Sequence, residues 1–496
     1  MNQRIAKNTL YLYLRMMFSM GVSFYASRVV LATLGVEDYG IYNVVGGVVV
    51  MFSFINASLG GATSRFLTFA LGRDDQVEFQ KSFSAALTIH ILIAFLLLVL
   101  AETVGLWFLE NKMVITPDRM NAARIVYQLS IVSAMVTIIQ TPYNATLIAH
   151  ERMNIYAYIE ILNSCLKLGI VLLLLNSHWD KLILYAVLVF VVTSLITGTY
   201  RLYCVKQFKE CRYHYEWDKK VIYPILTFSG WNVLGCGAFV GVTQGINMLL
   251  NVFFGTLLNA AYGVATMVEN ATISFVENFQ MAVNPQIVKH YAAGKINELH
   301  SLIFENAKLS FSLMWLLLLP ISLHIETILQ IWLVEVPEYA ALFCRLILFQ
   351  SLIVCIQRPF VMTIHATGRM KVFQLTTGTV LLSALPVSYF FLKAGAAPHV
   401  PFLICICSAA LELLVEMFLL RRWINLSFRT LFKTVFIPIA LIIVCTLPVS
   451  LAAGYYLHFL IAGSISGLSV CVSAYYIVFT KETRAIVLNK IKEIFN

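Results

Sequence analysis

The feature that most constrains this chain is a succession of apolar stretches, separated by short polar segments, that runs from one end to the other. A helix needs about 20 mostly apolar residues to span the hydrocarbon core of a bilayer, and the stretches are long enough. Their apolar runs are continuous, as in 91–100 and 313–321, whereas the strands of an outer-membrane barrel would alternate in shorter segments. With 60% hydrophobic and only 12% charged residues, a water-soluble fold is excluded.

Cutting the chain at its polar segments predicts an all-α polytopic membrane protein with about fourteen transmembrane helices. No connecting segment exceeds about twenty residues, so no soluble nucleotide-binding or catalytic domain fits outside the bilayer. The predicted spans are 9–33, 39–63, 82–109, 121–148, 155–175, 181–204, 222–253, 256–283, 301–333, 339–366, 370–393, 397–420, 431–453 and 455–479.

Basic residues concentrate in every second connecting segment, which predicts the orientation. With the N-terminus in the cytoplasm, the inner segments hold most of the Lys and Arg, among them Arg73, Arg152 and Arg369. The even number of spans then places both termini in the cytoplasm. The formal charge of +10 is therefore a topology signal, and no nucleic-acid partner is expected.

A weak internal repeat predicts two halves. The segment TPYNATLIAHERMN from Thr141 matches RPFVMTIHATGRMK from Arg358, and the aligned prolines, Pro142 and Pro359, are 217 residues apart. A second pair, YGIYNVVGGVVVMF near Gly40 and YGVATMVENATISF near Gly263, is also followed by a short basic loop in each copy. Each half has an even number of spans, so the two lobes share one orientation and are related by an axis along the membrane normal.

This repeat predicts the domain organisation. We expect an N-lobe of six helices (1–205), a cytoplasmic linker (206–221), a C-lobe of six helices (222–424), and two further helices with a cytoplasmic tail (425–496). The prolines of the repeat lie inside spans and should bend their helices.

Cations inside the predicted spans are the candidate substrate-binding residues, because a charge at the bilayer centre costs several kcal/mol and normally faces a cavity. Lys167 is the deepest, twelve residues from the inner end of its span and eight from the outer end. Arg15 lies on one helix face with Ser19 and Ser23. The remaining candidates are Arg28, Arg345 and Arg358. The alternative is that these cations lock helices together by pairing with Glu160, Glu269, Glu277, Glu412 or Glu416.

Polar residues form a stripe on span 256–283 and a shorter one on span 222–253. Asn270 and Ser274 on the first stripe, and Asn247 on the second, are candidates for hydrogen bonding to a polar substrate. The alternative is interhelical hydrogen bonding. Glu277 on the first stripe is the candidate for proton or sodium coupling, because desolvation favours the protonated carboxyl.

Motifs for catalysis or cofactor binding are not found in the sequence. It contains no CxxC pair, no glycine-rich phosphate loop and no paired histidines with metal-ligand spacing. We therefore expect no cofactor, no metal and no catalytic residue.

Several segments are similar to those of a known family: LGVEDYGIYNVV, SLGGATSRFLTFALGR, FSGWNVLG, NAAYGVATMV, NPQIVKHYAAGK and the RMK loop. They resemble bacterial polysaccharide-biosynthesis flippases of the O-antigen (Wzx) type, within the multidrug/oligosaccharidyl-lipid/polysaccharide exporter (MOP) superfamily. The resemblance covers spans 1 to 12. It implies fourteen helices with two six-helix lobes in the bacterial cytoplasmic (inner) membrane.

The same resemblance implies a function. Such a protein moves undecaprenyl-diphosphate-linked saccharide units across the membrane for O-antigen, capsule or lipopolysaccharide biosynthesis, by alternating access. Its partners are then a lipid-linked anionic oligosaccharide and membrane lipid, with a polysaccharide polymerase and chain-length machinery as candidate partners and Na⁺ or H⁺ as candidate coupling ions.

Two other functions stay open at this stage. One is a cation-coupled multidrug antiporter of the same superfamily, although the deep cations favour an anionic substrate. The other is a membrane-embedded glycosyltransferase or polymerase, which would normally carry a large outer loop or an acidic catalytic motif. Span 222–253 has no lysine or arginine, so a charge pattern expected in some relatives is missing from the second lobe.

Overall fold

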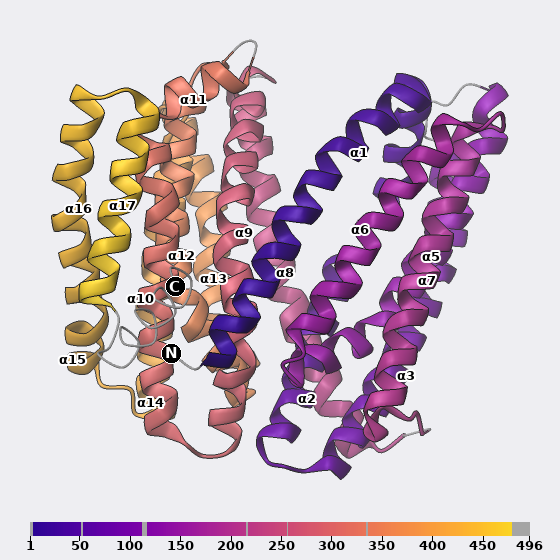
Figure 1. The fold of residues 1–496 in the computed structure, drawn as a ribbon, viewed down its shortest axis with the longest axis horizontal. Coiled ribbons are helices and arrows are strands. Elements are labelled where there is room, and N and C mark those ends of the chain that lie inside the picture. Colours follow the sequence, from indigo (N-terminus) through magenta and orange to yellow (C-terminus); the bar gives the residue numbers. More distant parts are fainter. Residues whose placement is uncertain are drawn as a thin grey trace, which may run out of the picture. The chain divides into compact units, whose positions relative to one another are not determined.

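The computed structural model describes residues 3–50, 53–111, 117–214, 217–254, 256–333 and 336–478, and these form helices without any strand (Figure 1). The α-helices are α1 (Gln3–Val50), α2 (Ser53–Gly72), α3 (Gln76–Leu100), α4 (Leu106–Asn111), α5 (Met120–Ala149), α6 (Met153–Leu175), α7 (Lys181–Gln207), α8 (Lys219–Phe254), α9 (Thr256–Ala292), α10 (Ile296–Leu323), α11 (Ile325–Trp332), α12 (Ala340–Thr367), α13 (Met370–Lys393), α14 (Val400–Ile424), α15 (Phe428–Leu431), α16 (Ile437–Tyr456) and α17 (Phe459–Ile477). Short π-helical segments, Ala101–Gly105 and Phe432–Phe436, join α3 to α4 and α15 to α16.

Within the described ranges, eleven helical stretches are long and apolar enough to cross a membrane, judged by length and composition. Each coincides with one predicted span, and the other three predicted spans fall on α1, α2 and α9. The prediction of an all-α, multi-pass membrane protein with about fourteen membrane helices is therefore confirmed.

One predicted boundary is wrong. The sequence interpretation ended the first span at 33 and began the second at 39, but α1 continues through these residues to Val50. Residues 34–38 contain acidic side chains but no proline, so nothing removes a backbone hydrogen bond there. At about 1.5 Å per residue, the 48 residues of α1 are longer than one bilayer crossing, so α1 contains the first predicted span and the start of the second.

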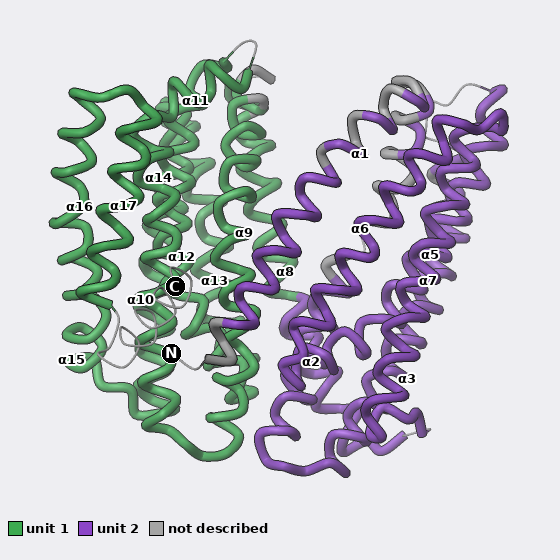
Figure 2. Tube along the Cα trace, in the orientation of Figure 1, with its two compact units in different colours: residues 1–5, 234–496 green, residues 6–233 purple. Residues whose placement is uncertain are grey.

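The chain divides into two compact units, coloured separately in Figure 2: residues 6–233, and residues 234–496 together with the first five. In the first unit, α5 packs against α7, α2 and α3, and α6 packs against α7. The centre of this bundle contains large side chains that are fully buried, including Phe79, Phe83, Tyr127 and Tyr200. The predicted lobe and linker boundaries at 205 and 222 remain predictions about functional organisation.

In the second unit, α12 is the central helix and packs against α9, α10 and α14. The two last helices, α16 and α17, lie against each other and against α10 (Figure 1). Trp315 of α10 donates its indole N–H to the hydroxyl of Thr446 on α16 at 2.9 Å, and both side chains are buried. The appended pair is thus anchored on α10 by a specific buried contact.

The two copies of the repeat share their local structure. Pro142 lies inside α5 and Pro359 lies inside α12, as predicted. Four residues on from each proline, a buried threonine donates its hydroxyl to the proline carbonyl: Thr146 at 2.9 Å and Thr363 at 2.8 Å. Each threonine thus gives the proline's own carbonyl a further hydrogen bond, one turn after the proline that bends the helix.

The turn after each of these helices is also equivalent. Glu151 and Gly368, again 217 residues apart, both adopt a left-handed backbone conformation, with φ of 58° and 75°. The next residues, Arg152 and Arg369, have nearly identical dihedral angles and begin α6 and α13. The repeat read from the sequence therefore corresponds to repeated backbone structure, in which α13 takes the place of α6.

Candidate functional site

A cavity of about 780 Å³ lies inside the first unit, between α1, α6 and α7. Two of the predicted substrate-binding residues, Arg15 of α1 and Lys167 of α6, line it together. Their neighbours in the lining include hydroxyl, amide and carboxylate groups: Ser19, Ser23, Glu160, Asn163, Ser164, Tyr42 and Tyr185. The fold thus brings two basic side chains, more than 150 residues apart in sequence, into one polar cavity.

Arg15 is held by an aromatic side chain at the start of α6. One guanidinium nitrogen donates to the Tyr156 hydroxyl at 3.0 Å, and the central guanidinium carbon lies 5.1 Å from the Tyr156 ring centroid. A cation over an aromatic face is attracted by the ring quadrupole. This contact fixes the guanidinium on the cavity wall while keeping its charge.

Lys167 lies about three turns further along α6 than Tyr156, with an exposed side chain on the cavity wall. Across the described residues, no carboxylate forms an ion pair with Lys167. Ser164, three residues earlier on the same helix face, lies 2.8 Å from the Ser19 hydroxyl and so joins α6 to α1. The ammonium group of Lys167 therefore remains available to an anion in the cavity.

Glu160 is the carboxylate of this cavity, and it is bonded to neutral donors. Its oxygens accept hydrogen bonds from the Tyr200 hydroxyl at 2.9 Å and from the Asn163 amide at 3.4 Å. The predicted alternative, in which Glu160 neutralises Lys167 through a direct ion pair, is not what the structure shows. With two cations and one carboxylate, the described lining has a positive formal charge.

Sequence reasoning named Lys167 and Glu160 on α6 but did not recognise them as part of one stripe, and it missed Tyr156 and Asn163. Tyr156, Glu160, Asn163 and Lys167 recur at spacings of three and four, which places them on one helix face. That spacing could have identified the stripe. Tyr185 was also missed; it packs edge-on against Tyr42, with ring centroids 4.7 Å apart. Such a long-range aromatic contact leaves no local signal in the sequence.

An ionic cluster ties together three helices of the same unit at the ends of α5 and α7. Arg119 donates to both Asp38 of α1 and Asp180, and its distance to the Asp180 carboxylate is 2.7 Å. Asp180 also caps α7 by accepting from the backbone N–H of Leu182 and Ile183. Partial burial, the largest influence, raises the pKa of Asp180, but the Ile183 N–H and the Arg119 guanidinium together bring it below its usual value.

In the second unit, the predicted cations are paired with carboxylates. Arg358 of α12 lies 2.8 Å from a carboxylate oxygen of Glu277 on α9. Arg345 lies 2.7 Å from Glu326 and also donates to the Ser322 carbonyl at 3.0 Å. The Arg358–Glu277 contact is the helix-locking alternative weighed from the sequence, whereas Glu326 was not among the partners considered.

The predicted polar stripes are partly engaged within the protein. Ser274 donates to the Asn270 carbonyl of its own helix at 2.6 Å, and the Asn247 side chain accepts from Asn259 at 2.6 Å. Asn270 itself has an exposed side chain. The side chain of the remaining candidate, Arg28, falls outside the described residues.

Among the described side chains, the remaining glutamates considered as partners form no ion pair with the predicted cations. Glu269 accepts from the Ser351 hydroxyl at 2.9 Å, and Glu412 accepts from Ser408 at 3.1 Å. Glu416 is only 2% exposed. In the described portion of the chain, no group of three or more His, Cys, Asp or Glu residues is placed to hold a metal ion.

Sequence and structure comparisons place this geometry in context. The family model for "Polysaccharide biosynthesis protein" matches residues 5–277, more than half of the chain. A comparison with curated proteins gives no match.

Several solved structures share the fold. An outward-facing multidrug resistance MATE family transporter of the MOP superfamily has a TM-score of 0.71 at 13% identity, covering 85% of this chain and 96% of its own. A MATE in the bent conformation has a TM-score of 0.72 at 14% identity, covering 87% and 97%. A MOP superfamily transporter from Pyrococcus furiosus, described as having a binding pocket of reverse polarity, has a TM-score of 0.68 at 13% identity, covering 86% and 96%.

At such low identities these structures define the fold and nothing finer. The fold shared with these transporters is the one that the resemblance in the sequence implied. The chain belongs to the polysaccharide biosynthesis protein family, and it is built on a MATE-type transporter fold.

Proposed function

We propose that this protein is a lipid-linked oligosaccharide flippase, which moves undecaprenyl-diphosphate-linked saccharide units across the bacterial cytoplasmic membrane for surface polysaccharide biosynthesis. The observation that carries the proposal is that Arg15 and Lys167 line one cavity whose carboxylate, Glu160, is bonded to neutral donors. In this proposal both termini are cytoplasmic, and the two lobes alternate access to the cavity.

The chemistry of the cavity suits a diphosphate linked to sugars. A guanidinium binds phosphate oxygens through paired N–H donors, and an ammonium supplies a compact charge. Ser19, Asn163 and Ser164 offer hydroxyl and amide groups for hydrogen bonds to sugar hydroxyls. A volume of about 780 Å³ lies in the range of ligand cavities, so the headgroup region is the part of the substrate that would enter.

The second unit has a different part in the proposal. Glu277 remains the candidate for proton or sodium coupling. In this proposal, a proton or sodium ion that binds Glu277 displaces Arg358 from its carboxylate. Arg28, Asn247, Asn270 and Ser274 remain candidates for substrate contacts in other stages of the transport cycle, whereas the ion pairs of Arg345 and Arg358 favour a structural role for these two. A polysaccharide polymerase and its chain-length machinery are the candidate partners downstream.

The competing proposal is a cation-coupled multidrug antiporter. It is favoured by the similarity of the fold to multidrug MATE transporters. The positive lining of the first cavity disfavours it, because a drug cation would have to approach Arg15 and Lys167 with only Glu160 as a counter-charge.

The test is flipping of a fluorescent undecaprenyl-diphosphate oligosaccharide in proteoliposomes, measured in parallel with efflux of an organic cation. Variants Arg15→Ala and Lys167→Ala are compared with the wild type at matched protein levels. Lys167→Arg keeps the charge, and Lys220→Ala removes an exposed lysine at the start of α8, outside the cavity lining.

We expect flipping to fall about 10- to 100-fold in both alanine variants, since a hydrogen bond to a charged group is worth about 1.5–3 kcal/mol. Lys167→Arg should retain most activity, and Lys220→Ala should match the wild type. An inactive wild type that instead exports organic cations, with a requirement for Glu277, would establish the antiporter in place of the flippase.

A further inference from the structure

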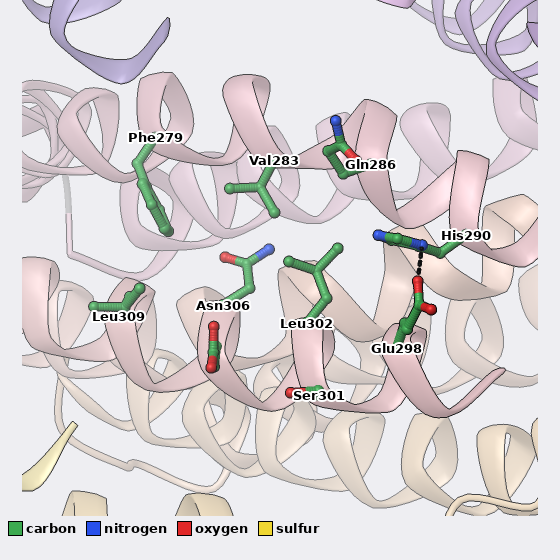
Figure 3. Close-up of a pocket in the computed structure, with 10 residues that line it drawn as sticks. Phe279, Val283, Gln286, His290, Glu298, Ser301, Leu302, Asn306 and Leu309 are labelled. Atoms are coloured by element: carbon green, nitrogen blue, oxygen red, sulfur yellow. Dashed lines mark ion pairs between the residues drawn. The ribbon is translucent and has the colours of Figure 1, made fainter. Parts of the chain in front are cut away.

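The second unit contains a smaller pocket of about 280 Å³ between α9 and α10, and the proposed function does not use it (Figure 3). The pocket extends across the predicted inner ends of spans 256–283 and 301–333, where the membrane surface is expected. One end is closed by an ion pair between His290 of α9 and Glu298 of α10, at 3.2 Å.

Asn306 of α10 points from its helix toward α9 in this pocket (Figure 3), and its side chain is only 1% exposed. Ser310 accepts a hydrogen bond from the Gln280 amide at 3.0 Å, so its own hydroxyl hydrogen is free to donate to the Asn306 oxygen, 3.1 Å away. The Asn306 amide nitrogen then has no partner among the described residues. A buried donor left unpaired costs about 1–3 kcal/mol, so this pocket needs an acceptor.

Glu305, the preceding residue, lines the same pocket with a half-buried side chain. No ion pair or hydrogen bond of its carboxylate is found in the described part of the structure, and Lys308, one turn further along α10, interacts with it only through its charge. Glu298, by contrast, has two basic neighbours, His290 at 3.2 Å and Lys295 at 3.6 Å. The pocket therefore offers one unpaired carboxylate beside one unpaired donor.

The rest of the lining includes apolar side chains, Phe279 and Val283 of α9 and Leu302 of α10. A complementary ligand needs a cationic N–H donor for Glu305, an oxygen acceptor for Asn306 and an apolar portion. A phospholipid whose headgroup ends in a primary ammonium has these features, since two carbons separate its ammonium from phosphate oxygens and acyl chains follow. Headgroups also lie at the depth where the pocket is expected.

We propose that this pocket between α9 and α10 is a binding site for a primary-ammonium phospholipid such as phosphatidylethanolamine. The ammonium donates to Glu305, a phosphate or ester oxygen accepts from Asn306, and the apolar part of the lining receives the start of an acyl chain. The site lies wholly within the second unit, so the inference stands whether or not the first cavity carries a lipid-linked sugar.

Native mass spectrometry of the detergent-purified full chain tests this, with equimolar phosphatidylethanolamine, phosphatidylcholine and phosphatidylglycerol. Phosphatidylcholine keeps the positive charge but has no N–H donor. Glu305→Gln removes the charge with little change of shape, and Ser301→Trp fills the exposed edge of the pocket without a charge change. Glu78→Gln, on a partly exposed glutamate of the other unit, is the control.

We expect the wild type and Glu78→Gln to retain phosphatidylethanolamine over phosphatidylcholine, and Glu305→Gln and Ser301→Trp each to lower that retention about tenfold. Retention unchanged in both pocket variants would overturn the proposal. So would equal retention of phosphatidylethanolamine and phosphatidylcholine. Displacement of the lipid by soluble ethanolamine phosphate at equal concentration would also overturn it, because the ligand would then be a free amine.

Discussion

The two units use deep basic residues in opposite ways. In the first, Arg15 and Lys167 line a cavity of about 780 Å³, and the cavity carboxylate bonds to neutral donors. In the second, Arg345 and Arg358 are each paired with a glutamate. One unit therefore places its deep cations in a polar cavity, while the other pairs them with carboxylates that hold helices together.

The difference follows from the packing of equivalent helices. Lys167 on α6 corresponds, 217 residues on, to Ala384 on α13, which is 2% exposed in an apolar cluster. In the second unit α8 approaches α13 closely at Gly245, where an added Cβ would lie 2.5 Å from a methyl carbon of Leu385. The small residues Gly245 on α8 and Ala384 on α13 let these two helices pack closely. This packing fills the position that corresponds to the cavity of the first unit.

The largest expected effect is a loss of stability when a lysine is placed in the second unit at the position equivalent to Lys167. Ala384→Lys places an unpaired ammonium in a packed apolar cluster and should destabilise the protein by about 3 kcal/mol or more. Thermal unfolding in detergent measures this effect. Ala384→Met, of similar length but uncharged, should cost about 1–3 kcal/mol through overpacking alone. If the lysine variant unfolded at no lower a temperature than the methionine variant, water would have to reach residue 384. The second unit would then not be closed at this position, and the contrast with the first unit would be wrong.

A second prediction concerns whether the first cavity prefers anionic or cationic substrates. Glu160→Gln keeps the side-chain shape and removes the cavity carboxylate, so it should improve binding of an anionic substrate by about 1 kcal/mol, a several-fold lower apparent KM for flipping. Initial flipping rates at varied substrate concentration give the KM. A several-fold higher KM, or loss of organic-cation efflux on the same substitution, would identify Glu160 as a substrate carboxylate and favour the antiporter.

Comparing sequence and structure shows which physical signals are local. Span positions, the repeat and the depth of Lys167 all depend on residue order, and the repeat is visible in equivalent turns at Glu151 and Gly368. Pairing is not local: nothing near Arg358 in the sequence indicates that Glu277, 81 residues earlier, lies 2.8 Å away. The continuity of α1 past residue 38 was also missed, because charged residues were taken to end a helix that they can continue.

A third, smaller effect is expected for the Arg358–Glu277 pair. The two side chains are 39% and 48% exposed, so solvent screens their attraction and a double-mutant cycle should give a coupling of about 0.5–1 kcal/mol. Thermal unfolding of Arg358→Ala, Glu277→Ala and the double variant measures it. Flipping by Arg358→Ala should stay within about threefold of the wild type. A tenfold or larger loss, with stability unchanged, would make Arg358 a substrate residue and remove the contrast between the units.

The smallest effect is the acid sensitivity of the ionic cluster beside the first cavity. The pKa of Asp180 is lowered in the folded state, so its stabilisation is present above its unfolded pKa near 3.8 and is lost as the pH falls through the folded value. Because the side chain is about one-third exposed, we expect only about 0.5 kcal/mol. Asp180→Asn should unfold slightly earlier than the wild type at neutral pH, and the difference should shrink as the pH falls below about 3.8. A difference that grew on acidification would contradict this assignment.

The most direct test of the contrast between the units is equilibrium binding of undecaprenyl diphosphate to the purified protein, titrated for the wild type, Lys167→Ala and Arg358→Ala. If the first unit holds the anionic site, Lys167→Ala should weaken binding at least about tenfold, and Arg358→Ala should change it less than about threefold. Binding that is lost in Arg358→Ala and kept in Lys167→Ala would contradict the account.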